Sequence, residues 1–144
     1  MLCRGAKGQV LSHEVSAALT AEMRRVVQIF PGTNLSCLLS ARGELVALVS
    51  HTEKEGQEVE LLAAAASLKR SALEFTAALD GDLRCPIVHV RGNDRLFSCY
   101  DVADHLLAFY TERHGMVLDQ LDMNESDAEM AGVIAKLEEI LQNG

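Results

Sequence analysis

Basic residues and proline are scarce in this sequence, and glycine is not in excess. There are 13 lysines and arginines against 21 aspartates and glutamates, which gives a formal net charge of −8. A nucleic-acid binder needs a basic face to displace counterions from phosphates, and so does a protein that binds an acidic membrane unaided, so both classes are disfavoured. With two prolines, ten glycines and 49% apolar residues, the chain is neither disordered nor fibrous. We expect a single domain over residues 1–144 with its own hydrophobic core.

We expect neither a targeting segment nor a membrane anchor. No apolar run reaches the ~18 residues that a transmembrane helix requires. Charged residues interrupt the first twenty positions, which excludes a signal-peptide core, and glycine stands at position 5 and not at position 2, where myristoylation occurs. These absences predict a cytoplasmic protein that reaches a membrane only when a partner carries it.

Cysteine is sparse and scattered. Cys3, Cys37, Cys85 and Cys99 form no CxxC motif, and no histidine lies at metal-ligand spacing from any of them. Cys85 and Cys99 fall on neighbouring predicted strands and could approach each other, but buried thiols are the commoner state of such residues. The pattern predicts free, mostly buried thiols in a reducing compartment, with neither a metal nor a cofactor.

Apolar periodicity predicts helices that alternate with short strands in the order α-β-β-α-β-β-β-α. Ser12 is the expected N-cap of the first helix, and Gly43 should supply a positive φ between the first two strands. Asn124–Asp127 is poor helix material, so we expect the last helix to restart at a capping box of Ser126 and Glu129. The predicted elements are a helix at 10–30, strands at 34–40 and 44–50, a helix at 58–79, strands at 84–91, 95–102 and 105–111, and a final helix from 116.

The helix predicted at 58–79 carries two apolar stripes. A helix that lies on one sheet needs a single stripe, so two stripes indicate contacts on two sides. The helix is then either deeply buried in a monomer or paired with a second subunit, where the run Ala63–Ala66 permits close approach. The first stripe is expected to face the domain's own sheet and consists of Leu61, Ala65, Leu68, Ala72, Phe75 and Leu79. The second, rotated by about 100°, consists of Val59, Leu62, Ala66, Leu73 and Ala77.

Three stretches of sequence, with the element order, carry a family resemblance that covers essentially the whole chain. They are LLAAAASLKRSA at 61–72, the VRG turn at 90–92 and VADHLLAFY at 102–110. The chain resembles the roadblock/LC7 family in these stretches. Within the family, VADHLLAFY together with Met1–Leu2 and Gln9–Ser12 is similar to the late-endosomal and lysosomal adaptor of the Ragulator complex.

The resemblance implies an α/β (α+β) fold of roadblock/longin type, with a five-stranded antiparallel sheet and helices packed on it. It also implies pairing with a second roadblock-type subunit, as a homodimer or a heterodimer, through the central helix and the third strand. Small GTPases of the Rag type and kinase scaffold proteins are the further partners implied, and the membrane is reached only through a lipidated partner. The interface expected from the resemblance consists of Leu62, Ala66, Lys69, Arg70, Leu73, Ile87, Val88, His89 and Val90.

Catalytic motifs are missing. The sequence has no phosphate-binding loop, no GxGxxG, no nucleophile elbow and no HExxH, so we expect no enzyme activity and no bound nucleotide. His89 and His105 could meet Asp101 or Asp104 as an acid–base pair, although such histidines are more often structural. The acidic residues at 119–129 lack EF-hand spacing and are expected to be a solvated helix face, with a cation or basic-partner site as the alternative.

Four functions are compatible with these features. A scaffold for small-GTPase and kinase signalling at late endosomes or lysosomes is favoured. A dynein light chain or a homodimeric GTPase regulator of roadblock type is the nearest alternative. A longin-like or profilin-like trafficking module that binds a peptide or actin is a third, and a small enzyme is the fourth.

Overall fold

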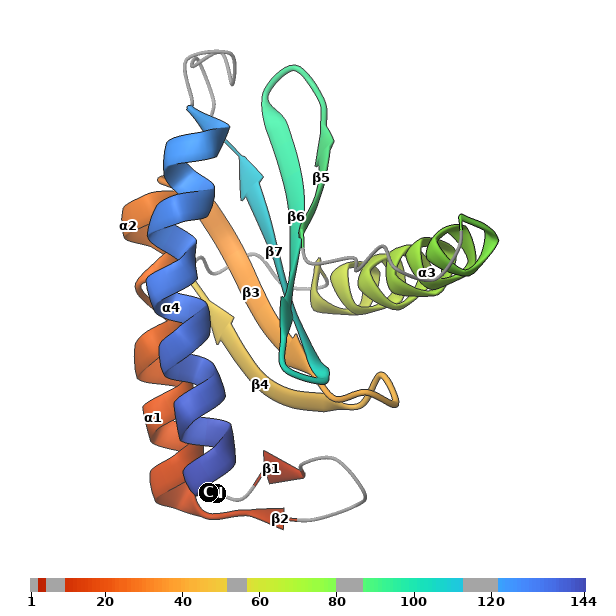
Figure 1. Ribbon diagram of the computed structural model, residues 1–144. Helices are drawn as coiled ribbons and strands as arrows, with labels where there is room; N and C mark the ends of the chain where they lie inside the picture. Colours follow the sequence, from red (N-terminus) through yellow and green to blue (C-terminus); the bar gives the residue numbers. More distant parts are fainter. Residues whose placement is uncertain (1–2, 5–9, 52–56, 80–86, 113–121) are drawn as a thin grey trace.

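The computed structural model describes residues 3–4, 10–51, 57–79, 87–112 and 122–144, and these form a five-stranded antiparallel sheet with helices on both faces (Figure 1). The strand order is β4-β3-β7-β6-β5. The predicted fold class is thus confirmed. The elements are β1 (Cys3–Arg4), β2 (Val10–Leu11), α1 (His13–Met23), α2 (Val26–Ile29), β3 (Thr33–Leu39), β4 (Leu45–Ser50), α3 (Gln57–Ala78), β5 (Ile87–Arg91), β6 (Arg95–Val102), β7 (His105–Glu112) and α4 (Met123–Asn143).

The N-terminal region differs from its prediction in two ways. The helix expected from residue 10 begins at His13, because Val10 and Leu11 pair with β1 in a small two-stranded sheet. The same helix is divided in two, since α1 ends at Met23 and α2 starts at Val26. The predicted N-cap is confirmed, because the Ser12 hydroxyl accepts a hydrogen bond from the Val15 amide at 3.2 Å.

The first hairpin follows the predicted chemistry. Gly43 has a φ of 81°, and it lies in the turn that joins β3 to β4. The hydroxyl of Ser40 accepts hydrogen bonds from the amides of Arg42 and Glu44, so the turn's backbone donors are satisfied locally. Glycine is required here because an L side chain is disfavoured at positive φ.

The start of α4 corrects a prediction. The helix begins at Met123 with Asp122 as its N-cap, and the Asp122 carboxylate accepts a hydrogen bond from the Glu125 amide at 3.1 Å. Ser126 lies inside the helix and is buried, so the predicted restart at Ser126 and Glu129 is wrong. Asp122 is an equally good cap four residues earlier, and an acidic residue in the first turn suits the helix dipole.

Several other predictions fall outside the described residues. They are the start of the predicted strand at 84–86, which contains Cys85, and the predicted helical start at 116–121. The predicted strands at 95–102 and 105–111 correspond to β6 and β7.

The two faces of the sheet support two separate apolar clusters. On one face, α1, α2 and α4 pack side by side, with Phe30 and Phe109 in ring contact at a centroid distance of 4.9 Å. On the other face, α3 is the one described helix that packs on the sheet, through Leu61 and Ala65 above Leu35 and Cys37 (Figure 1). Of the two faces, the one under α3 is covered by fewer of the described helices.

Within the described ranges, none of the helices combines the length and the apolar character needed to cross a membrane.

Candidate partner-binding site

The edge strand β5 pairs with β6 in antiparallel register, with His89 opposite Ser98 and Val90 opposite Phe97. Side chains alternate between the two faces of a strand, so Val88 and Val90 lie on the α3 face while Ile87 and His89 lie on the α4 face. Among the described strands β5 is the last in the sheet order, and an edge strand can pair with another chain. Ile87 and Val90 are 37% and 52% exposed, and such apolar exposure on an edge strand is typical of a pairing surface.

The helix α3 buries only part of its apolar surface. Leu61 and Ala65 are buried against the sheet, whereas Leu73, Phe75 and Leu79 are 55%, 65% and 48% exposed. Phe75 and Leu79 belong to the stripe that was expected to lie on the domain's own sheet. That expectation is wrong for the C-terminal half of the helix, because the sheet ends before the helix does.

The C-terminal part of α3 extends past the edge of the sheet, as the length of the helix and the width of the strands show. Leu61 lies in the same groove as Leu35 of β3, and Ser71 lies in it with Val90 of β5. Ten helical residues rise ~15 Å, and the three strand spacings from β3 to β5 total ~14 Å, so α3 crosses the strands nearly at right angles. The seven residues that follow Ser71, up to Ala78, therefore extend ~10 Å beyond β5, which is about two strand widths.

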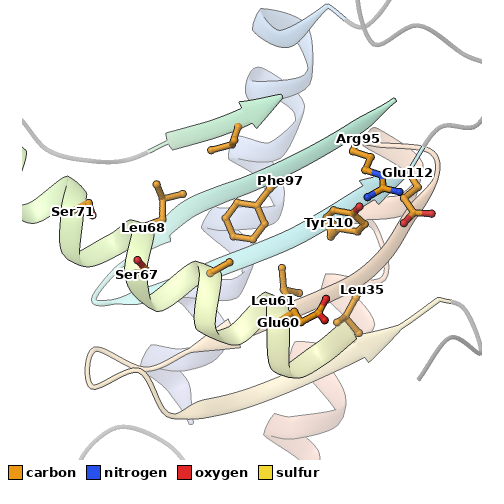
Figure 2. A pocket seen from close by; sticks show the side chains of 12 residues that line it. Leu35, Glu60, Leu61, Ser67, Leu68, Ser71, Arg95, Phe97, Tyr110 and Glu112 are labelled. Atoms are coloured by element: carbon orange, nitrogen blue, oxygen red, sulfur yellow. The ribbon is translucent and has the colours of Figure 1, made fainter. Parts of the chain in front are cut away.

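A groove of about 760 Å³ lies along one flank of α3, between this helix and the sheet (Figure 2). Its floor is apolar, with Phe97 at the centre and Leu68 of α3 beside it. Its helical wall carries the small side chains of Ala64, Ser67 and Ser71. The volume falls in the range of sites that accommodate a ligand or a partner's side chains.

The far end of the groove is polar. Figure 2 shows Arg95 of β6 together with Tyr110 and Glu112 of β7 at this end. Burial raises the pKa of the Tyr110 hydroxyl above its usual value, and the neighbouring Glu112 carboxylate adds to the rise while Arg95 opposes it. The groove thus combines an apolar floor with a charged end, an arrangement typical of protein-binding sites.

The nine residues predicted for the interface lie on two adjoining elements, α3 and β5. Arg70, Leu73, Ile87 and Val90 are exposed. Leu62, Ala66, Lys69, Val88 and His89 are partly buried, and Leu62 and Val88 pack against the apolar cluster under α3. The exposed members present the most surface to a partner, and the full set stays a prediction.

Lys69 also acts within the domain. Burial raises the pKa of the Asp101 carboxyl on β6, and the positive charge of Lys69 counteracts that rise. This residue therefore lies within electrostatic reach of the sheet, on the flank of α3 opposite the groove.

Three solved structures share this architecture. The gliding protein MglB from Thermus thermophilus superposes with a TM-score of 0.73 at 13% identity, covering 93% of this chain and 96% of its own. A roadblock/LC7 domain from Streptomyces avermitilis gives 0.68 at 18% identity, covering 85% and 97%. MglB from Myxococcus xanthus gives 0.69 at 14% identity, covering 92% of each chain.

This chain has the roadblock/LC7 fold. No protein-family model matches the sequence, and no curated protein matches it either. At identities of 13–18% the likeness is one of fold. The sequence resemblance to the roadblock/LC7 family is therefore supported at the level of architecture.

A polar network ties the edge strand of this roadblock fold to α4. His89 Nδ1 lies 2.7 Å from Ser98 Oγ, and His89 Nε2 lies 3.0 Å from Asp127 Oδ1. The Tyr100 hydroxyl donates to the same carboxylate oxygen at 2.6 Å. Because a carboxylate only accepts, Nε2 donates to Asp127, and in the neutral ring Nδ1 accepts from Ser98. His89 thus meets Asp127, and not Asp101 or Asp104 as considered from the sequence, whereas His105 does lie 2.8 Å from Asp104.

The network contains the residue types of a serine hydrolase, but its geometry does not suit catalysis. Ser98 is fully buried, so no substrate can reach its hydroxyl. Burial and the Asp127 carboxylate raise the pKa of the Tyr100 hydroxyl, which keeps it a protonated donor. Asp127, Ser98 and Tyr100 escaped sequence reasoning because 38 residues separate Asp127 from His89 and no motif links them.

Cysteine and metal chemistry find no support in the described part of the chain. Cys37 and Cys99 are buried thiols outside any disulfide, as predicted for these two. Both pair with Ala108 from opposite sides of β7, so a whole strand separates them. Burial raises the pKa of the Cys37 thiol to about 12, which makes it a poor nucleophile. Among the described residues, no three His, Cys, Asp or Glu side chains gather to hold a metal ion.

Proposed function

We propose that this protein is a non-catalytic adaptor subunit that pairs with another roadblock-type subunit through α3 and β5 and supports small-GTPase signalling. The observation that carries the proposal is the location of the exposed apolar residues. Among the residues that the structure describes, six large apolar side chains are exposed, and five of them lie at the C-terminal end of α3 or on β5: Leu73, Phe75, Leu79, Ile87 and Val90. Exposed apolar side chains on both faces of an edge strand and on the helix beside it are suited to pairing with another sheet.

The finer assignment is to the Ragulator type, with Rag-type GTPases and MAP-kinase and TORC1 signalling components as partners at late endosomes or lysosomes. Its support is the sequence resemblance at VADHLLAFY, Met1–Leu2 and Gln9–Ser12. Membrane attachment through a lipidated partner belongs to the same proposal.

A homodimeric regulator of roadblock type is the second candidate. One of the similar structures is MglB with a tetrameric arrangement. It superposes on this chain with a TM-score of 0.72 at 15% identity. Self-association of the present chain would favour this candidate over a heterodimer.

The test is affinity purification of the tagged chain from native extract, with mass spectrometry of the co-eluting proteins. We expect a second roadblock protein and a small GTPase with the unaltered chain. Leu73→Glu should lose the second subunit, because an unpaired charge would be buried at the contact. Leu45→Glu is the matched control, since Leu45 is 40% exposed and lies on β4 at the other edge of the sheet.

The outcomes separate the alternatives. Loss of the partner with Leu73→Glu but not with Leu45→Glu supports pairing through α3. Equal recovery with both variants contradicts it. Recovery of a dynein intermediate chain in place of a GTPase would indicate the light-chain branch.

A further inference from the structure

The floor of the groove beside α3 is one row of neighbouring side chains that crosses four strands. Leu35 of β3 lies opposite Tyr110 of β7 in the sheet register. Tyr110 lies opposite Phe97 of β6, and Phe97 lies opposite Val90 of β5. All four line the groove, and the three strand spacings between them total ~14 Å. The groove is therefore an elongated trough with α3 along one side, as Figure 2 shows.

This floor gives an occupant apolar contact but few hydrogen bonds. The strands β3, β7 and β6 each have a neighbour on both sides, so their backbone groups are used within the sheet. The helical wall adds only the small side chains of Ala64, Ser67 and Ser71. An extended peptide in the groove would leave most of its own amides without partners, a cost that an alkyl chain does not have. The volume of about 760 Å³ also falls in the range of small-ligand sites.

Negative charge is in excess around the groove. Among the described residues that line it are two carboxylates, Glu60 and Glu112, and one guanidinium, that of Arg95. The Arg95 side chain is 63% exposed, and its Nε lies 3.9 Å from the Asp94 carboxylate, which offsets its charge. Glu112, by contrast, is only 9% exposed. Water screens the charge of a buried carboxylate poorly, so Glu112 favours a positive group beside it.

The Tyr110 hydroxyl reports the sign of the electrostatic potential at this end of the groove. Burial raises its pKa most, the negative charge of Glu112 raises it further, and the positive charge of Arg95 opposes the rise by less. An anionic ligand group would therefore be repelled here, and a cationic one attracted. The groove thus combines room for an apolar chain with a place for a positive charge.

We propose that the groove binds a small amphiphile, an alkyl chain that ends in a protonated amine. The chain lies over Phe97 and against the Ala64 and Ser67 side of α3, and the ammonium group donates a hydrogen bond to the Glu112 carboxylate. This inference goes beyond the proposed pairing. The floor of the site extends inward from β5 to β3, whereas Leu73, Phe75 and Leu79 lie towards the end of α3 that extends past β5.

Titration with probes that share an octyl chain and differ in head group tests the proposal. The probes are n-octylammonium, n-octanol and n-octanoate, and binding to the ¹⁵N-labelled chain is followed by amide chemical shifts in NMR spectra. Octylammonium should shift the amides of Ser67, Phe97 and Tyr110. Its dissociation constant should be lower than that of octanoate by about 10-fold, because the two heads differ in the sign of their charge.

Two variants and one matched control locate the site. Ala64→Leu should abolish binding of octylammonium, because the larger side chain fills the groove. Ala63→Leu should leave binding unchanged, since Ala63 is exposed, lies ~100° around the helix and does not line the groove. Glu112→Gln should remove the preference for octylammonium over octanoate while octanol binds as before.

Three results would overturn the proposal. They are the absence of octylammonium binding, binding that survives Ala64→Leu, and octanoate binding as tightly as octylammonium to the unaltered chain. None of these results bears on pairing through β5, which the affinity purification tests separately.

Discussion

The carboxylate of Asp127 joins α4 to two strands, and its removal tests whether this junction holds the edge strand β5 in place. It accepts hydrogen bonds from the Tyr100 hydroxyl at 2.6 Å and from His89 Nε2 at 3.0 Å. Asp127→Ala removes both acceptor contacts at once. Tyr100 is fully buried, so its hydroxyl would lose its acceptor in a place that water reaches poorly.

The magnitude follows from the two contacts. A hydrogen bond to a charged group contributes about 1.5–3 kcal/mol, so two such bonds set an upper limit of about 6 kcal/mol. The Asp127 side chain is 27% exposed, and water can satisfy part of what is lost. We therefore expect Asp127→Ala to lower the free energy of unfolding by about 2–4 kcal/mol.

A double-mutant cycle with Tyr100→Phe isolates the Tyr100–Asp127 bond. Phenylalanine keeps the ring and its 5.8 Å stacking distance to Phe109, and it removes only the hydroxyl. We expect the double variant to be more stable than additivity predicts, by about 1–2 kcal/mol.

Urea denaturation followed by far-UV circular dichroism is the suitable assay, because the chain has no tryptophan. Protein concentration must be constant, since self-association would raise the apparent stability. Amide hydrogen exchange in β5 should also be faster in Asp127→Ala than in the unaltered chain. A coupling energy below about 0.5 kcal/mol, or unchanged exchange in β5, would refute the reasoning.

Two further predictions concern the backbone and the pH dependence. Gly43→Ala should lower the free energy of unfolding by about 1 kcal/mol, because Gly43 has a φ of 81° that an L side chain disfavours. Gly132→Ala should raise it by about 0.8 kcal/mol, because Gly132 lies inside α4, where alanine has the higher helix propensity. At neither position does the added Cβ meet an atom within 4 Å. Urea denaturation of both variants measures the difference, and shifts of the same sign would contradict it. The pKa of Cys37 rises from 9.0 to about 12 on folding, so between these values the unfolded chain releases a proton that the folded chain keeps. The free energy of unfolding should therefore fall as pH rises above 9, by up to about 1.4 kcal/mol per pH unit. In urea denaturation at a series of pH values, Cys37→Ala should show a smaller slope. Identical slopes for the two chains would show that this thiol does not contribute.

Local signals in the sequence were sufficient for most elements of the fold. The period-two and period-3.6 patterns predicted five strands and the long helix α3, and the resemblance supplied their arrangement as one antiparallel sheet. Gly43 and Ser12 were predicted in the roles that they have, because a turn and an N-cap depend on a few neighbouring residues. The start of α4 was missed because two capping residues, Asp122 and Ser126, competed within four positions.

The candidate site depended more on long-range packing. The sequence showed that α3 carries more apolar surface than one sheet can cover, but the periodicity of a helix does not reveal where its neighbour ends. Phe75 and Leu61 belong to one stripe, yet Leu61 is buried and Phe75 is 65% exposed, because α3 crosses the strands and extends past β5. Similarly, His89 meets Asp127 only because the sheet packs against α4.

By itself, the sequence determined the elements, the turn chemistry and the excess apolar surface, since these depend on residues that are neighbours along the chain. The tertiary structure alone decided which flank of α3 is hollow, which apolar side chains remain exposed, and which polar groups join β5 to α4. Those properties depend on the relative placement of elements that lie far apart in the sequence, and such placement is set by the packing of the whole sheet.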